Sequence, residues 1–133
     1  MRRTLDTNIC SYILRRHPAS MIERFAALER SQLWLSAIVV AELRFGAVKL
    51  ASARFSAAVE AWVNGFDVRP WPIDASSHYA RTRASLETAG KSIVAMDLLI
   101  AAHAMAEDTV VITNNASEFL RVPGLAVEEW TLE

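Results

Sequence analysis

The sequence has little cysteine and no apolar run long enough to cross a membrane. Cys10 is the only cysteine among 133 residues, so the chain can form no internal disulfide. The longest apolar stretches, Leu33–Leu43 and Ile93–Ala106, are each interrupted by an acid, which a membrane helix would rarely tolerate. Low-complexity segments and internal repeats are missing as well. These absences argue against a disulfide-bonded scaffold, a membrane protein and a repeat array.

The N-terminal residues carry charge in place of the apolar core of a signal peptide. Arg2 and Arg3 are followed by Asp6, with no apolar segment directly behind them. Together with the lone cysteine, this favours the cytoplasm. The composition is 53% hydrophobic and 22% charged, which is typical of a soluble globular protein. We therefore expect one domain spanning residues 1–133.

The balance of charge permits a nucleic-acid partner without demonstrating one. The net charge of −1 comes from 14 basic and 15 acidic residues, and at first argues against such a partner. If four acids bound metal ions, however, 11 acids would face 14 bases and the surface would carry about +3. The bases occur in small groups, which ordinary solvated helix faces also produce. These groups are Arg2–Arg3, Arg15–His17 and Arg81–Arg83.

Segments with strand and helix patterns alternate along the chain, which predicts an α/β domain with a mainly parallel sheet. Predicted strands cover Thr4–Asp6, Leu33–Ser36 (which alternates apolar and polar residues), Thr109–Thr113 and Leu125–Trp130, with Val68–Ile73 as an edge strand and turn. Predicted helices cover Ile9–Arg15, Ser20–Arg30, Ile38–Leu50, Ala53–Gly65, Asp74–Thr88 and Val94–Glu107.

Several helix ends carry capping signals. Ser20 and Glu23 have the spacing of a capping box. Asp74 suits the N-cap of its helix, and Gly90 suits the position after the C-terminus.

Three acids occupy positions where a purely structural role is hard to supply. Asp6 follows the first strand directly, and ligands in parallel sheets bind at such carboxyl ends, although Asp6 could also cap the next helix. Glu42 is the only charge in Leu33–Leu43, so a structural account needs a partner such as Arg44. Asp97 lies among apolar residues near the start of a buried helix, where Asp is rarely found unless paired or metal-bound.

Glu118 has two interpretations. It lies three residues after Asn115, which is the spacing of a capping box without any function. It also lies just past the carboxyl end of the strand at Thr109–Thr113, where a fourth ligand would be expected.

Carboxylates gathered at one sheet edge repel one another unless cations bind among them. An all-oxygen set of ligands selects Mg²⁺ or Mn²⁺, and such sites commonly hydrolyse phosphodiesters. The three histidines show no metal-ligand spacing, and His103 is offset from Asp97 around their helix. We therefore expect His17, His78 and His103 to be non-catalytic.

The order and spacing of several motifs resemble the PIN-domain ribonucleases, specifically the VapC toxins of bacterial type II VapBC toxin–antitoxin systems. The match runs from near Leu5 to Trp130, and its specificity comes from all blocks being in register. The matching blocks are Leu5–Asn8, Ser36–Leu43, Asp97–Ala104, Val111–Asn115, Glu118–Phe119 and Val122–Leu125.

This resemblance implies a three-layer α/β/α sandwich that binds Mg²⁺ or Mn²⁺ and cuts RNA internally by hydrolysis. Asp6, Glu42 and Asp97 match the three most regular family acids, which hold the metal. Asn115 stands where the fourth family acid usually lies, and we expect Glu118 to substitute for it as a catalytic acid. The residues that match supporting positions are Thr7, Asn8, Thr113 and Asn115.

The resemblance also implies partners. It implies a homodimer, a neutralising VapB-type antitoxin, and DNA contact only indirectly through the antitoxin complex, with no membrane association. The implied substrate is a structured RNA, with tRNA favoured, whose cleavage inhibits translation.

Two other enzyme classes fit poorly, and one binding function fits better. A dehalogenase-type phosphatase needs a second Asp where Asn8 stands, and a receiver domain needs an acidic pair and a late lysine before a proline. The stronger alternative is a catalytically weakened PIN-fold module that binds RNA or protein. The amide of Asn115, in place of an acid, favours this alternative. Retention of three costly buried acids argues against that alternative.

Overall fold

A five-stranded, all-parallel sheet forms the centre of the molecule. The computed structural model describes residues 2–132, so the ends of the predicted domain, at 1 and 133, lie outside the described residues. The strand order across the sheet is β3-β2-β1-β4-β5. The strands are β1 (Arg3–Leu5), β2 (Leu33–Ser36), β3 (Asp67–Arg69), β4 (Val110–Thr113) and β5 (Ala126–Glu129).

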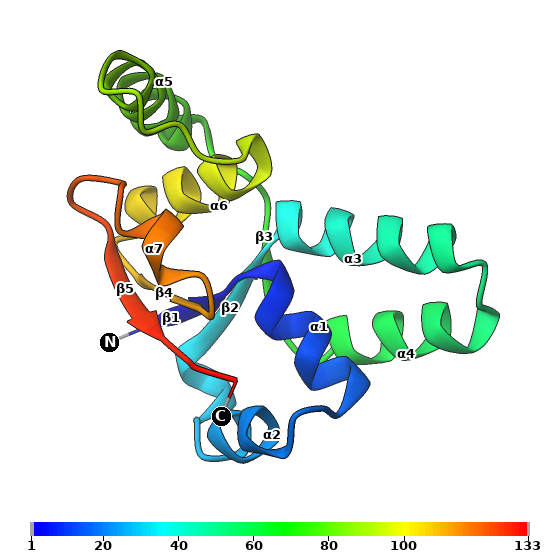
Figure 1. The fold of residues 1–133 in the computed structure, drawn as a ribbon. Helices are drawn as coiled ribbons and strands as arrows, with labels where there is room; N and C mark the ends of the chain where they lie inside the picture. Colours follow the sequence, from blue (N-terminus) through cyan, green and yellow to red (C-terminus); the bar gives the residue numbers. More distant parts are fainter. Residues whose placement is uncertain (1, 133) are drawn as a thin grey trace.

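Helices flank both faces of the sheet and complete three layers. In Figure 1, α5 and α6 lie on one side of the sheet, α1 and α2 lie on the other, and α3 and α4 project as an antiparallel hairpin. The helices are α1 (Thr7–Arg15), α2 (Ala19–Ala26), α3 (Ala37–Leu50), α4 (Ala53–Val63), α5 (Ile73–Thr88), α6 (Ala95–Ala106) and α7 (Ala116–Phe119), with a 3₁₀ turn at Arg30–Gln32. Within residues 2–132, none of these helices has the length and apolarity that a membrane crossing needs. The predicted α/β sandwich is thus confirmed.

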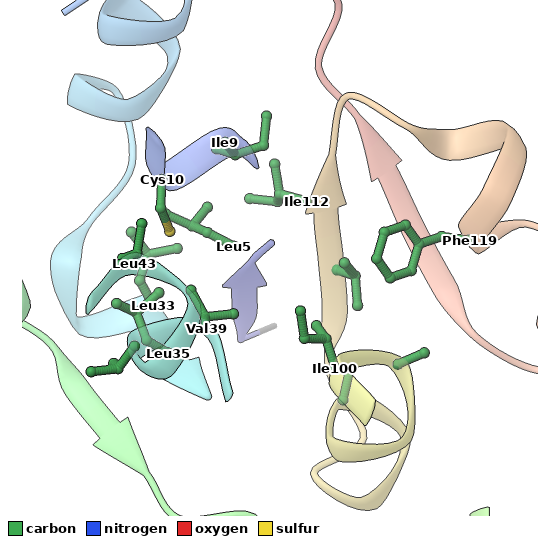
Figure 2. Close-up of a cluster of buried hydrophobic side chains, with 14 of the residues drawn as sticks. Leu5, Ile9, Cys10, Leu33, Leu35, Val39, Leu43, Ile100, Ile112 and Phe119 are labelled. Atoms are coloured by element: carbon green, nitrogen blue, oxygen red, sulfur yellow. The ribbon is translucent and has the colours of Figure 1, made fainter. Parts of the chain in front are cut away.

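The core explains why the inner strands β2 and β4 are apolar. Leu5 on β1 and Ile112 on β4 are paired in register and fully buried, with Ile9 of α1 and Ile100 of α6 packed nearby (Figure 2). Strands covered on both faces have continuous runs of apolar residues. For the same reason the alternation read into Leu33–Ser36 was wrong, because all four of its residues are buried.

The capping signals were right at one helix end and wrong at two others. Gly90 lies just beyond the C-cap of α5 with φ +67°, and the Lys91 amide donates to the Leu86 carbonyl across it. Asp74, however, lies inside the first turn of α5, because Pro72 takes the cap position.

The predicted capping box at Ser20 is also absent. Helix α2 starts earlier, at Ala19 after Pro18, and the Ser20 hydroxyl has no partner among the described residues. The same helix ends at Ala26, short of the predicted end near Arg30, because Arg30 belongs to the separate 3₁₀ turn.

The order of the strands creates one crevice suited to a ligand. From the central β1 the chain moves to β2 and β3 on one side, then returns to β4 and β5 on the other. Open parallel sheets bind ligands at such a reversal, outside the carboxyl ends of the strands. The residues that follow β1 and β4 are therefore the first place to look for a site.

Ser36 joins the end of β2 to the helix layer through two contacts. Its Oγ accepts from the Ile38 amide at 3.1 Å, which caps α3, and lies 2.8 Å from Nδ1 of the buried His103. The imidazole also packs edge-on against Trp34, with ring centroids 4.6 Å apart.

We expect Ser36→Ala to destabilise the protein by about 2–4 kcal/mol, since it removes a helix cap and leaves a buried imidazole nitrogen without its partner. Ser52→Ala is the matched control, because Ser52 caps α4 with no buried histidine attached, and it should cost only about 1 kcal/mol. Urea unfolding of both variants measures the difference. Equal losses would show that the contact with His103 contributes nothing.

Candidate active site

Asp6 lies at the reversal point and holds two elements together. It directly follows β1, and only 3% of its surface is exposed. Its Oδ1 accepts from the Ile9 amide at 2.9 Å, and its Oδ2 accepts from the Thr113 hydroxyl at 2.5 Å. Asp6 therefore does cap α1, as one interpretation predicted. Its second oxygen also reaches the end of β4, which a cap alone does not require.

Glu42 lacks the cationic partner that a structural role would need. It sits in the second turn of α3, half-buried, and accepts a hydrogen bond from the Thr7 hydroxyl at the start of α1. Arg44 pairs instead with Glu60 of α4, at 2.8 Å. Glu42 thus faces the Asp6 side of the molecule as an uncompensated carboxylate.

Glu118 connects α7 to the start of α6, close to Asp97. Its Oε1 accepts from the Val94 amide at 2.8 Å, and its Oε2 accepts from the Asn115 side-chain amide at 2.5 Å. The capping-box interpretation is wrong, because Asn115 precedes α7 without any side-chain cap. Asp97 lies in the first turn of α6, half-buried.

The supporting residues differ in how firmly the fold holds them. Thr113 is fully buried, and its Oγ1 also accepts a hydrogen bond from the backbone amide of Asn115 at 2.8 Å. Thr7 is fixed by its hydrogen bond to Glu42. Asn8 is exposed and makes no side-chain hydrogen bond within the described residues.

The four acids act on one another electrostatically. Burial raises the pKa of Asp6 to about 6 against the hydrogen bonds from Thr113 and Ile9, and the charges of Glu42 and Glu118 raise it further. Burial, followed by the charges of Glu118, Asp6 and Glu42, raises the pKa of Asp97 to about 7. The fold therefore brings these side chains, from four separate elements, within electrostatic reach of one another and makes the ionisation of Asp6 and Asp97 costly.

Comparison with known proteins agrees with this arrangement. The PIN domain family matches residues 4–125. The tRNA(fMet)-specific endonuclease VapC of Shigella flexneri is 37% identical over 96% of both chains, and Ribonuclease VapC2 of Rickettsia felis is 34% identical over 95% of this chain and 96% of its own. This chain belongs to the VapC family of PIN-domain ribonucleases.

Solved VapC structures share the fold over nearly the whole chain. VapBC from Salmonella typhimurium bound to DNA superposes with a TM-score of 0.90 at 37% identity, covering 98% of both chains. VapBC2 from Rickettsia felis bound to a promoter DNA fragment gives 0.87 at 33% identity, covering 98% of this chain and 99% of the other.

The acids of this VapC family member have the oxygen donors that a hard divalent cation prefers. In the structure, however, the side chains are not arranged around a cation. Within residues 2–132 no three acidic, histidine or cysteine side chains stand close enough together to hold an ion. The donors are nevertheless all oxygens, and burial together with mutual repulsion raises the pKa of Asp6 and Asp97, a cost that a cation would relieve. The chemistry of these residues thus fits such an ion.

The histidines of this VapC family member lie elsewhere. His103 is enclosed by Trp34 and Ser36, and burial lowers its pKa, while Glu107 opposes that effect and Arg69 adds to it. It packs in the interior of the fold, and its non-catalytic role stays a prediction. The sequence did not reveal its pairing with Ser36, because a serine at the end of a strand signals only a helix cap.

The raised pKa of Asp6 predicts how stability depends on pH in the absence of metal. Its folded pKa of about 6 exceeds the usual 3.8, so the folded chain holds the proton more tightly than the unfolded chain. The resulting stabilisation is complete below about pH 4 and is lost as pH rises through about 6, a change of ~3 kcal/mol. Asp97 extends the same trend toward pH 7.

Urea unfolding in EDTA between pH 4.5 and 7.5 measures this slope, and Asp6→Asn should flatten it. Wild-type protein whose stability rises over that range would contradict the assignment.

Proposed function

We propose that this chain is the toxin of a VapBC pair, an endoribonuclease that hydrolyses phosphodiester bonds inside RNA. The observation that carries the proposal is the set of four mutually repelling carboxylates at the reversal point of the sheet. Burial and the charges of the neighbouring acids raise the pKa of Asp6 and of Asp97, which describes a site that gains from positive charge. Asp6 also caps α1, but capping does not account for the other acids gathered near it.

Asp6, Glu42 and Asp97 are proposed to hold Mg²⁺ or Mn²⁺, on which PIN-domain nucleases generally depend. When bound, such an ion would lower the pKa of a water molecule and offset charge on the scissile phosphate. Glu118 is proposed as the fourth catalytic acid, in place of the acid that Asn115 replaces. The expected products are a 5′-phosphate and a 3′-hydroxyl.

The neighbouring polar groups are proposed to orient these carboxylates. Thr113 holds one oxygen of Asp6 toward β4, and Thr7 holds Glu42 toward α1. Asn115 directs Glu118 back to the start of α6. Through these hydrogen bonds Asp6, Glu42 and Glu118 each keep a fixed direction, so that less reorganisation is required when the substrate arrives.

The partners are proposed from relatives. A relative bears the name tRNA(fMet)-specific endonuclease, and neighbouring structures are VapBC complexes, some with DNA. We propose a tRNA substrate whose cleavage inhibits translation, a VapB-type antitoxin as inhibitor, and DNA contact through that antitoxin alone. A homodimer, a cytoplasmic location and one PIN domain over 1–133 complete the proposal.

The alternative is a weakened PIN-fold module that binds RNA or protein without cutting. The amide at Asn115 favours it, because a metal ligand is lost there. The position of Glu118 beside Asp97 favours an active site instead, since its charge raises the pKa of Asp97.

Asp97→Asn should lower RNA cleavage by at least about 100-fold, equivalent to ~2.7 kcal/mol of transition-state stabilisation, because the carboxylate is removed without changing its shape. Asp74→Asn is the matched control, since Asp74 occupies the first turn of α5 as Asp97 does that of α6. Purified, antitoxin-free proteins are incubated with total bacterial RNA in Mg²⁺, Mn²⁺ or EDTA, and new ends are sequenced.

Discrete products that need metal, persist in the Asp74 variant and vanish in the Asp97 variant would support the proposal. If the folded wild-type protein cuts nothing with either metal, the ribonuclease proposal fails and the binding module is the remaining interpretation.

Metal binding can be tested without any cleavage. At ten times its dissociation constant, Mn²⁺ should raise the Tm by roughly 4–6 °C, since a ligand of the folded state stabilises it. Glu42→Gln should remove most of this shift, whereas Glu60→Gln should keep it, because Glu60 is paired with Arg44 on the exposed side of α4. Thermal unfolding with Mn²⁺ or EDTA gives the comparison. An equal shift in both variants would place the ion elsewhere.

A further inference from the structure

A hollow of about 440 Å³ opens between α1 and the α3–α4 hairpin, and one end of it is the candidate active site. Glu42 and Thr7, which contact each other at that end, belong to its lining. The lining residues on which the following argument depends are Thr7, Arg15, Glu42, Gly46, Lys49 and Phe55.

One face of α3 forms the floor of this hollow. Glu42, Gly46 and Lys49 are spaced four and three residues apart, which puts them on one face of the helix. A strand of substrate that follows this face would therefore run from Lys49, over Gly46, to Glu42.

Gly46 has no explanation within the chain itself. It lies inside the helix, where glycine is the least favourable residue after proline. Its φ is not in the left-handed region, and a Cβ built on it would meet nothing within 4 Å in the described residues. Packing among the described residues therefore does not require a glycine, and its lack of a side chain leaves the backbone open to close approach by a ligand.

Two free cations line the hollow away from the acids. Arg15 and Lys49 are exposed, and within residues 2–132 neither forms an ion pair or a hydrogen bond. By contrast, Arg44 pairs with Glu60 on the same hairpin. Unpaired bases next to a cluster of acids attract a polyanion and hold it where its own charge would otherwise be repelled.

We propose that this hollow seats the RNA strand next to the cleavage point, with its phosphates against Arg15 and Lys49 and its backbone passing over Gly46. The half-buried ring of Phe55 offers a face on which one base can stack. The inference rests on the proposed function. RNA is favoured over an acidic peptide because Arg15, Lys49 and the ring of Phe55 together suit the phosphates and bases of a nucleotide strand. The apolar residues Leu43 and Leu50 also belong to the lining.

The first test measures RNA binding without cleavage. Fluorescein-labelled bulk bacterial tRNA is titrated with antitoxin-free protein in EDTA at 50–200 mM KCl. Arg15→Gln and Lys49→Gln should each weaken binding by roughly two- to fivefold. Each should also lower the slope of log Kd against log salt by about 0.7–0.9, the share of one phosphate contact. Arg81→Gln, on the exposed face of α5, is the control and should change neither quantity.

The second test separates binding from stability at Gly46. Gly46→Ala should raise or maintain the Tm, since alanine favours a helix, and yet weaken tRNA binding. Gly46→Leu should weaken tRNA binding further. Ala57→Leu, which introduces the same leucine on the exposed face of α4, should leave tRNA binding unchanged.

Failure of this inference is distinguishable from failure of the proposed function. If the wild type cleaves RNA and the variants keep full tRNA affinity, the inference is overturned and the ribonuclease stands. If nothing is cleaved but the variants lose affinity as expected, the inference stands alone. If Gly46→Leu releases a co-purifying VapB-type antitoxin while tRNA affinity is unchanged, the hollow is a protein-docking groove and the inference is overturned.

Discussion

The rest of the site depends on burying the Asp6 carboxylate at the junction of β1, β4 and α1. A carboxylate enclosed to this extent costs several kcal/mol unless hydrogen bonds compensate it. Here the Ile9 amide, the Thr113 hydroxyl and the start of α1 share that task. Because two of these groups belong to α1 and one to the end of β4, the Asp6 carboxylate is held from two elements at once, and the other acids are arranged around a fixed charge.

The fold was largely predictable from the sequence because its signals are local. Short apolar strands between helical segments indicated the parallel sheet, and the strand before Asp6 indicated the position of that acid. What was missed depends on tertiary contacts. The start of α5 was misassigned because Pro72, and not Asp74, takes the cap. The contact between His103 and Ser36 spans 67 residues of sequence, so no local pattern announces it.

The site was predictable in its members and unpredictable in its connections. An acid inside an apolar helix is visible in the sequence, which is why Glu42 and Asp97 could be named. The direction of the Glu118 side chain could not be read from the sequence. In the structure the Asn115 side-chain amide donates to one oxygen of Glu118, and the other oxygen accepts from the Val94 amide. A residue that looks like the loss of one acid therefore orients another. The place of Glu118 in the site stays a prediction.

The same helix face carries both Glu42, a proposed metal ligand, and Gly46, which limits how the site can change. Glu42 and Gly46 are one turn apart on α3, so any rotation of the helix that improves one position moves the other. Alanine at Gly46 would favour the helix, as it does in helices generally, yet it would occupy the space above the floor of the hollow. Glycine at this position lowers the stability of the helix and leaves the path to Glu42 open. Loss of stability at a site of function, with no internal contact to explain it, is the pattern expected where a surface is shaped for a partner.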